Sequence, residues 1–384
     1  MSISLNMSFS EFFEQYQEKK PLLIKGAASN TRFSWEDVNN IFDNSDAASN
    51  DFKLSLDGIR PKSEYVENYL DIGVLRHRLI KPVIYENLKN GATLIANKIK
   101  NSKKVNEISN QIATFTGRQV VSSAYLSFGS KDSFRCHWDT RDVFAIQLIG
   151  RKRWIVYEPS LKSPLYTQQS KDYEHLYPCP HSPYMDIVLE AGDVLYLPRG
   201  WWHNPLPLEE ATFHLAIGTF PAYTVDYLSW LFKRFEVFNG VRRSLHNWQQ
   251  DKDSLSSVGQ HVNELITDPN NYHCFLDEFT GATRVDSSLA LDIFGNPNAG
   301  KLPDHYGVRL CTNSCHGLND GYIIVNGTRL NLDKQSQKLI RHIGKFPDTS
   351  IGTLLINFPE TPTNQVRKLI NQLCHLDILE LSRA

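Results

Sequence analysis

The chain has 384 residues, 41% of them hydrophobic, which suffices for a sizeable core and for two or three folded units. Its formal net charge of -1 excludes a general attraction to nucleic acid or to anionic membranes. A run of about eighteen apolar residues, as a membrane span needs, does not occur, and the N-terminus lacks the pattern of a signal peptide. We therefore expect a cytoplasmic protein without a membrane partner, whose six cysteines are free thiols.

The first elements are predicted from helix-start patterns. Ser8 and Glu11 have the spacing of a capping box, which predicts an amphipathic helix after Ser8. A short buried strand is predicted at 21–24, and Ser34 is the expected N-cap of a second helix that begins with acidic residues. Residues 46–120 mix short strand and helix signals and give no clear assignment.

The middle of the chain is rich in β-branched and aromatic residues, and it predicts a series of short strands. Gly150 lies between two of them and fits a tight hairpin. Short strands at such intervals indicate an antiparallel sandwich or barrel, so the fold class is mainly β with α. The predicted strands cover residues 122–128, 143–149, 153–157, 186–189, 194–197 and 212–217.

Beyond Pro221 the pattern becomes helical. Apolar residues recur at three- and four-residue intervals from Leu228 to Phe238 and predict a helix face that packs against a helix of this chain or of a second copy. Residues 265–320 are rich in loop signals. The remainder predicts a small winged-helix-like order of elements, with strands at 322–325 and 376–381 and helices at 334–343 and 365–373.

Three residues have the types and spacing of a mononuclear iron site. His137 and Asp139 are two positions apart, so in an extended strand both side chains leave the same face. His203 can join them if its strand lies beside the first. Two imidazoles and one carboxylate leave the other positions of a ferrous ion open, as oxygen activation requires. The alternative is a chance triplet and a histidine that is merely packed after Trp201 and Trp202, which we expect to wall the site.

Three further residues are candidates for the same site. Lys152 follows the Gly150 turn, and its ammonium can bind the distal carboxylate of 2-oxoglutarate, although an exposed basic turn explains it equally well. Tyr125 lies on the preceding strand and can reach that carboxylate or fill the core. His214 follows on a later strand, where a packed histidine is the simpler interpretation.

Two local patterns are weaker. The four lysines between residues 98 and 104 form a short basic stretch, which a solvated helix end or loop explains as well as a nucleic-acid contact. The cysteines and histidine at 311–316 resemble half of a zinc site, but no second pair follows at a useful spacing. We interpret the cysteine and histidine pattern as structural.

A family likeness is carried by the segments at 21–26, 137–139, 144–154 and 192–203. Over about the first 220 residues, the chain resembles the JmjC-domain, or cupin-like, Fe(II) and 2-oxoglutarate oxygenases. The likeness is closest to their hydroxylase branch, which includes the ribosomal oxygenases and the asparaginyl hydroxylase of the hypoxia factor. It implies a double-stranded β-helix (jelly-roll) with iron on the His137, Asp139 and His203 triad and 2-oxoglutarate on Lys152. Ala216 and Phe134 depart from polar residues that related enzymes often carry there.

The order of elements also resembles that of bacterial ribosomal oxygenases. It implies a JmjC/cupin-like catalytic domain at 1–221, a helical and possibly dimerising region at 222–318, and a winged-helix-like domain at 319–384. The expected function is hydroxylation of an amino-acid side chain in a ribosomal-protein-like or peptide substrate, using O2 and releasing succinate and CO2. Demethylation by the same chemistry ranks lower. The alternatives are a non-oxidative metal-dependent cupin enzyme and a nucleic-acid-binding protein with an inert barrel.

Overall fold

The structure is a computed structural model, and it describes residues 3–100, 102–129, 135–285, 287–298 and 300–382. The chain divides into two compact units, Met1–Phe220 and Pro221–Ala384. Across the described ranges, no helix is both long and apolar enough to cross a membrane.

A seven-stranded antiparallel sheet forms the larger layer of the first unit, in the order β1-β10-β7-β12-β6-β5-β2. β10 lies between β1 and β7, so strands far apart in the sequence are neighbours, as in a sandwich or barrel. The strands are β1 (Leu22–Ile24), β2 (Phe52–Ser55), β5 (Thr93–Ala96), β6 (Gln119–Ser127), β7 (Val143–Ile149), β10 (Val194–Leu197) and β12 (Thr212–Phe220).

A smaller antiparallel sheet has the order β11-β8-β9, formed by Trp202–Pro207, Lys152–Tyr157 and Met185–Leu189. β7 and β8 therefore belong to different sheets, and the predicted hairpin at Gly150 is wrong. Gly150 has a φ of +63°, and a Cβ there would lie 1.9 Å from the Ala211 carbonyl oxygen. Only glycine fits this corner, which carries the chain from one sheet to the other.

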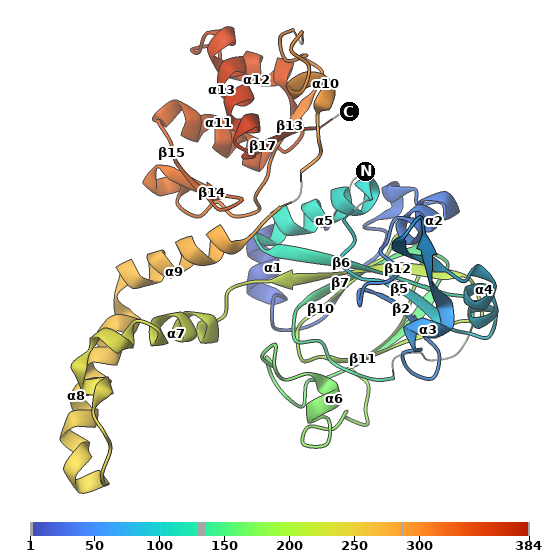
Figure 1. Ribbon diagram of the computed structural model, residues 1–384, viewed down its shortest axis with the longest axis horizontal. Coiled ribbons are helices and arrows are strands. Elements are labelled where there is room, and N and C mark those ends of the chain that lie inside the picture. Colours follow the sequence, from blue (N-terminus) through green and yellow to red (C-terminus); the bar gives the residue numbers. More distant parts are fainter. Residues whose placement is uncertain (1–2, 101, 130–134, 286, 299, 383–384) are drawn as a thin grey trace. The chain divides into compact units, whose positions relative to one another are not determined.

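The large sheet buries both of its faces. On one face, Phe144 and Ile146 of β7 belong to the main core with helices α1 (Phe9–Gln15), α2 (Trp35–Asp43) and α5 (Lys103–Thr116), and Figure 1 shows α5 running along β6. On the other face, Ala145 clusters with Trp154 of the smaller sheet. This alternation follows from the two-residue period of a strand.

The predicted helix starts are confirmed. Ser8 accepts a hydrogen bond from the Glu11 backbone N–H (3.2 Å), and Ser34 forms a capping box with Asp37. Between these helices and β6, a β-hairpin and short helices fill the stretch that gave no clear assignment. The remaining elements of the first unit are η1 (Ser29–Thr31), α3 (Lys62–Tyr65), β3 (Val66–Asp71), β4 (Val74–Leu79), α4 (Lys81–Lys89) and α6 (Ser170–Tyr173).

The second unit begins with helices, and two predictions about them are wrong. α7 ends at Phe232, and Phe235 turns in a separate 3-10 segment to pack on the Tyr227 cluster, so no single helix reaches Phe238. The loop-rich expectation for 265–320 is wrong at 269–282, where Asp268 caps α9. The elements are α7 (Thr224–Phe232), η2 (Phe235–Val237), η3 (Asn239–Arg242), α8 (Trp248–Thr267), α9 (Pro269–Ala282) and α10 (Leu291–Phe294).

The second unit ends in a small α/β fold with its own core. β13 pairs with both β16 and β17, so the chain segment before residue 319 contributes to this sheet. Its core runs from Leu302 to Leu381. The elements are β13 (Gly307–Leu310), η4 (Leu318–Asp320), β14 (Tyr322–Val325), β15 (Thr328–Asn331), α11 (Lys334–Lys345), β16 (Thr349–Ser350), α12 (Ile351–Asn357), α13 (Thr363–His375) and β17 (Leu379–Ser382).

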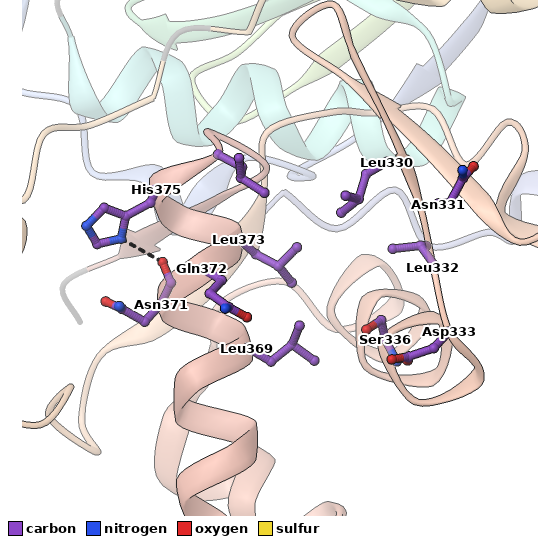
Figure 2. Close-up of a pocket in the computed structure, with 11 residues that line it drawn as sticks. Leu330, Asn331, Leu332, Asp333, Ser336, Leu369, Asn371, Gln372, Leu373 and His375 are labelled. Atoms are coloured by element: carbon purple, nitrogen blue, oxygen red, sulfur yellow. Dashed lines mark hydrogen bonds between the residues drawn. The ribbon is translucent and has the colours of Figure 1, made fainter.

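A pocket of about 630 Å³ lies between β15, α11 and α13 (Figure 2). Two of its polar side chains, Asp333 and His375, already have hydrogen-bond partners in α11 and α13. Asp333 caps α11 by accepting from the Ser336 backbone N–H (2.7 Å), and His375 Nδ1 donates to the Asn371 carbonyl (2.8 Å). The pocket is therefore lined by leucine side chains and by these two polar groups, which are already hydrogen-bonded at the ends of α11 and α13.

Candidate metal centre

The two sheets bring His137, Asp139 and His203 together. One ligand atom from each residue lies within 4.8 Å of the others. His203 Nε2 is 3.8 Å from Asp139 Oδ2, and the two imidazole centroids are 4.4 Å apart. Among the described residues, this is the one group of three or more His, Cys, Asp or Glu side chains close enough to hold a metal ion.

Backbone contacts fix the spacing of the three residues. The His137 N–H donates to the His203 carbonyl (3.1 Å) and the His203 N–H donates to the His137 carbonyl (2.8 Å), so the two residues are directly opposite. The Gly200 N–H donates to the Asp139 carbonyl (2.9 Å). A Cβ at Gly200 would lie 2.7 Å from the Leu161 carbonyl oxygen, so the turn before β11 requires glycine.

Both imidazoles are oriented by a backbone carbonyl two residues earlier. His137 Nδ1 lies 3.0 Å from the Arg135 carbonyl oxygen, and His203 Nδ1 lies 3.0 Å from that of Trp201. Because a carbonyl oxygen only accepts, each Nδ1 carries the proton and each Nε2 keeps a lone pair. This is how histidine ligands are held around metals in proteins.

The charges of the cluster also suit a cation. Burial, with the nearby His137 ring, lowers the pKa of His203 to about 4, so this imidazole is neutral at ordinary pH. Burial works to raise the pKa of Asp139, but Arg141 and the two imidazoles outweigh it and hold that pKa below its usual range. Arg141 lies 3.7 Å from the Asp139 carboxylate. The cluster therefore offers the neutral imidazole of His203 and the carboxylate of Asp139, beside Nε2 of His137.

Lys152 and Tyr125 face the same interior from opposite sheets. Lys152 begins β8 and is 4% exposed, so it is not a residue of an exposed turn. Burial, followed by the Asp139 charge, raises the pKa of Tyr125 to about 12, which keeps its hydroxyl protonated. The Tyr125 ring stacks on His214 with centroids 4.9 Å apart.

His214 links these two residues. It is 3% exposed, and burial, together with the Lys152 charge, holds its pKa well below the usual value. Its Nδ1 is buried without a hydrogen-bond partner, as is Nε1 of Trp154, whose ring lies edge-on to His214 at 5.6 Å. Buried polar atoms without partners are rare, and here they mark a place where a polar ligand fits.

Aromatic residues surround the cluster. Trp201 and Trp202 are buried, and Trp202 packs edge-on against Trp138 with ring centroids 4.6 Å apart. Trp202 Nε1 donates to Ser160 Oγ (2.9 Å). These contacts attach the segment between β8 and β9 to β11, which carries His203.

Sequence reasoning missed two residues beside the cluster. Arg141 continues the alternation that places His137 and Asp139 on one face, and this pattern could have found it. Trp154 is two residues after Lys152 on β8, with its ring 5.9 Å from that of His203. Phe134 lies outside the described residues, and Ala216 pairs with Ser123 and Ala145 in the large sheet.

The weaker patterns have structural partners. Lys98 pairs with Asp51 (3.1 Å) and Lys104 with Asp37 (2.5 Å), so part of the basic stretch is neutralised. His316 Nε2 lies 2.8 Å from an Asp277 carboxylate oxygen. Neither pattern forms a ligand cluster within the part of the chain that the structure describes.

A comparison with protein families agrees with the fold and the site. Residues 94–227 match the JmjC domain family. The two antiparallel sheets and the His-Asp-His cluster fit the cupin-like fold of that domain.

The relatives of this chain include a ribosomal oxygenase and a histidyl-hydroxylase. Ribosomal oxygenase 1 of Danio rerio is 27% identical over 222 residues, which are 54% of this chain and 38% of that protein. The bifunctional lysine-specific demethylase and histidyl-hydroxylase NO66 of Dictyostelium discoideum is 25% identical over 221 residues, 55% of this chain and 40% of that protein. The chain thus spans less than half the length of these curated relatives.

Solved structures show the same fold over the whole chain. The Escherichia coli ribosomal oxygenase YcfD has a TM-score of 0.60 and 16% identity, with 100% of each chain covered. A second YcfD structure, in complex with cobalt and 2-oxoglutarate, has a TM-score of 0.59 at 16% identity and covers 99% of each chain.

Proposed function

We propose that this protein is an Fe(II)- and 2-oxoglutarate-dependent oxygenase that hydroxylates an amino-acid side chain of a ribosomal-protein-like or peptide substrate. The observation that carries the proposal is the orientation of the two imidazoles, each with Nδ1 on a backbone carbonyl and Nε2 available beside Asp139. Bound iron with 2-oxoglutarate and O2 would supply the oxidation of an unactivated C–H bond, with release of succinate and CO2.

The chain's own residues supply binding and orientation. His137, Asp139 and His203 would hold the metal on one face and leave its other positions open. The Lys152 ammonium would bind the distal carboxylate of 2-oxoglutarate through a charge-assisted hydrogen bond, which is strong in a buried setting. Tyr125 keeps its proton because its pKa is about 12, so its hydroxyl would donate to the same carboxylate.

Neighbouring side chains shape the space for this cosubstrate. His214 Nδ1 and Trp154 Nε1, both buried without a partner, would bind its oxygens directly or through water. Ser123, Ala145 and Ala216 are opposite one another in the large sheet, and their small side chains leave the inner face open.

The finer architecture is also part of the proposal. The two sheets would form a double-stranded β-helix, with the His137 segment as the fourth strand of the smaller sheet through its bridge to His203. A helical region would follow the JmjC domain at residue 222. The winged-helix-like unit would start near Leu302 instead of residue 319, because Leu302 and β13 belong to its core.

The helical region would mediate a homodimer. Several of its large apolar side chains are exposed, including Phe232 (72%), Val237 (85%) and Trp248 (68%). Exposed apolar side chains mark a protein contact where they gather in one patch. Light scattering should give twice the mass of the chain, and Phe232→Glu with Trp248→Glu should yield the monomer; a monomeric unmodified protein would remove this part of the proposal.

Mass spectrometry of candidate substrates tests the activity. Ribosomal proteins are incubated with Fe(II), 2-oxoglutarate and either the unmodified protein or His137→Ala, and then digested. Hydroxylation adds one oxygen atom, about 16 Da, to one peptide, whereas demethylation removes about 14 Da from a methylated one. A gain of oxygen that depends on His137 supports the proposal. Succinate release that never depends on His137 contradicts it.

A further inference from the structure

Two cysteines meet beside the metal cluster, although 43 residues separate them in the sequence. Cys136 Sγ and Cys179 Sγ are 3.3 Å apart, and both residues are half-buried. Cys136 directly precedes His137. Cys179 belongs to the segment between β8 and β9, which Figure 1 shows beside β11 around α6. A thiol pair at this distance needs only a movement of about 1 Å to reach the 2.05 Å of a disulfide bond.

We propose that Cys136 and Cys179 are an oxidation site, where peroxide forms a reversible disulfide bond that weakens metal binding at His137. The effect on metal binding rests on the proposed function, whereas the formation of the disulfide bond does not. In the reaction, one thiol loses its proton and the thiolate attacks hydrogen peroxide, so that an S–O bond forms and the O–O bond breaks; the hydroxide that leaves takes up that proton and becomes water. The other thiol then displaces the hydroxyl group, so an S–S bond forms and a second water leaves. Two electrons pass from the two thiols to peroxide.

The backbone on the Cys179 side resists movement. Cys179 stands between Pro178 and Pro180, and each proline ring restricts its own φ angle and the residue before it. The segment is further held by Ser160 Oγ, which donates to the Tyr177 carbonyl (3.1 Å). The contraction therefore falls mainly on Cys136.

Movement of Cys136 reaches the metal cluster by two short routes. Cys136 lies between Arg135, whose carbonyl accepts from His137 Nδ1, and His137 itself. The His137 backbone is also paired with His203 through two hydrogen bonds. Metal sites tolerate displacements of about 0.2 Å, so a shift of about 1 Å next to a ligand lowers affinity.

The test uses the full chain without added iron. Reduced protein is treated with hydrogen peroxide, the peptides are mapped without reductant, and Mn(II) affinity is measured from the electron paramagnetic resonance signal of free Mn(II). We expect a 136–179 cross-linked peptide and an affinity about tenfold lower, the lower end of the effect of disturbing groups that orient ligands. Dithiothreitol should restore the affinity.

Matched variants separate this site from general oxidation. Cys179→Ser should bind Mn(II) like the unmodified protein and lose the response to peroxide, while Cys315→Ser, an exposed thiol of the second unit, should keep the response. Circular dichroism melting confirms that each variant is folded. Cys136→Ser is a second variant that should lose the response to peroxide.

Three results would overturn the inference in distinguishable ways. Absence of the cross-linked peptide in protein that binds Mn(II) removes the oxidation site and leaves the proposed function intact. A cross-link with unchanged Mn(II) affinity removes the coupling to the metal. Reduced protein that binds no Mn(II), but still forms the cross-link, refutes both the proposed metal site and the coupling, while the oxidation site stands.

Discussion

The metal cluster of the first unit and the pocket of the second unit contain similar functional groups but use them differently. In the pocket, Asp333 and His375 are already hydrogen-bonded within α11 and α13. In the cluster, Nδ1 of His203 binds a carbonyl while its Nε2 faces Asp139, and His214 Nδ1 is buried with no partner. Buried polar atoms that have no partner indicate a ligand more strongly than the volume of a pocket does.

The largest expected effect distinguishes the two places directly. His203→Ala removes one of three ligands, so we expect 2-oxoglutarate turnover, measured as succinate by NMR, to fall more than about 100-fold. Asp333→Ala removes an N-cap in the pocket; it should cost about 1 kcal/mol of stability and leave turnover unchanged. Equal losses of turnover in the two variants would contradict the distinction.

A second comparison concerns the aspartates that organise each unit. Asp142, 2% exposed, accepts from Tyr196 Oη (2.9 Å) and pairs with Arg118 (3.0 Å). Asp277, 19% exposed, pairs with Arg329 (2.6 Å). Removing a buried partner leaves an unpaired charge, so Asp142→Ala should lower the free energy of unfolding by about 3 kcal/mol and Asp277→Ala by about 1 kcal/mol. Urea unfolding measures both values. A larger loss in Asp277→Ala than in Asp142→Ala would contradict the argument from burial.

The next prediction concerns the proposed binding of 2-oxoglutarate by Lys152. Lys152→Met should raise KM for 2-oxoglutarate about 30-fold, the equivalent of about 2 kcal/mol for one buried charge-assisted hydrogen bond. Lys152→Arg keeps the charge and should recover part of the loss. Steady-state kinetics with each variant measures both. An unchanged KM in Lys152→Met would remove Lys152 from the site.

The smallest effect is a pH dependence that comes from two buried histidines of the first unit. His203 has a folded pKa of about 4 and His214 one well below 6.5, whereas unfolded histidine titrates near about 6.5. Below that pH the unfolded chain takes up protons that the folded apoprotein does not. The free energy of unfolding should therefore fall with falling pH, by up to about 1.4 kcal/mol per pH unit for each histidine.

His214→Phe is the matching control, because it keeps a ring against Tyr125 and removes one titrating group. Thermal melts of the apoprotein between pH 7 and 5 should show a smaller slope in this variant. An unchanged slope would mean that His214 is protonated in the folded protein.

Local patterns predicted much of the fold and the residues of the cluster. The six strands and the His137–Asp139 spacing depend on a two-residue period, which is visible in the sequence. The corner at Gly150 was predicted as a hairpin because glycine with a positive φ occurs both in hairpin turns and where a chain crosses between sheets. β11 was missed because it contains Pro205 and Pro207, which argue against a strand.

Other features depend on partners far away in the sequence. Asp268 and Pro269 resemble a loop signal, yet they are the N-cap and first residue of α9. The unpartnered Nδ1 of His214 and the contact between Cys136 and Cys179 exist only once the sheets are assembled. The spacing of residues in the sequence does not predict these contacts.

Crystals grown without oxygen in Mn(II) and 2-oxoglutarate, with anomalous difference maps, test the central claim most directly. The account predicts one anomalous peak per chain, about 2.0–2.3 Å from ligand atoms of His137, Asp139 and His203. Density for 2-oxoglutarate should extend from it to Lys152 Nζ. A peak elsewhere, or cosubstrate density in the pocket of the second unit, would contradict the account.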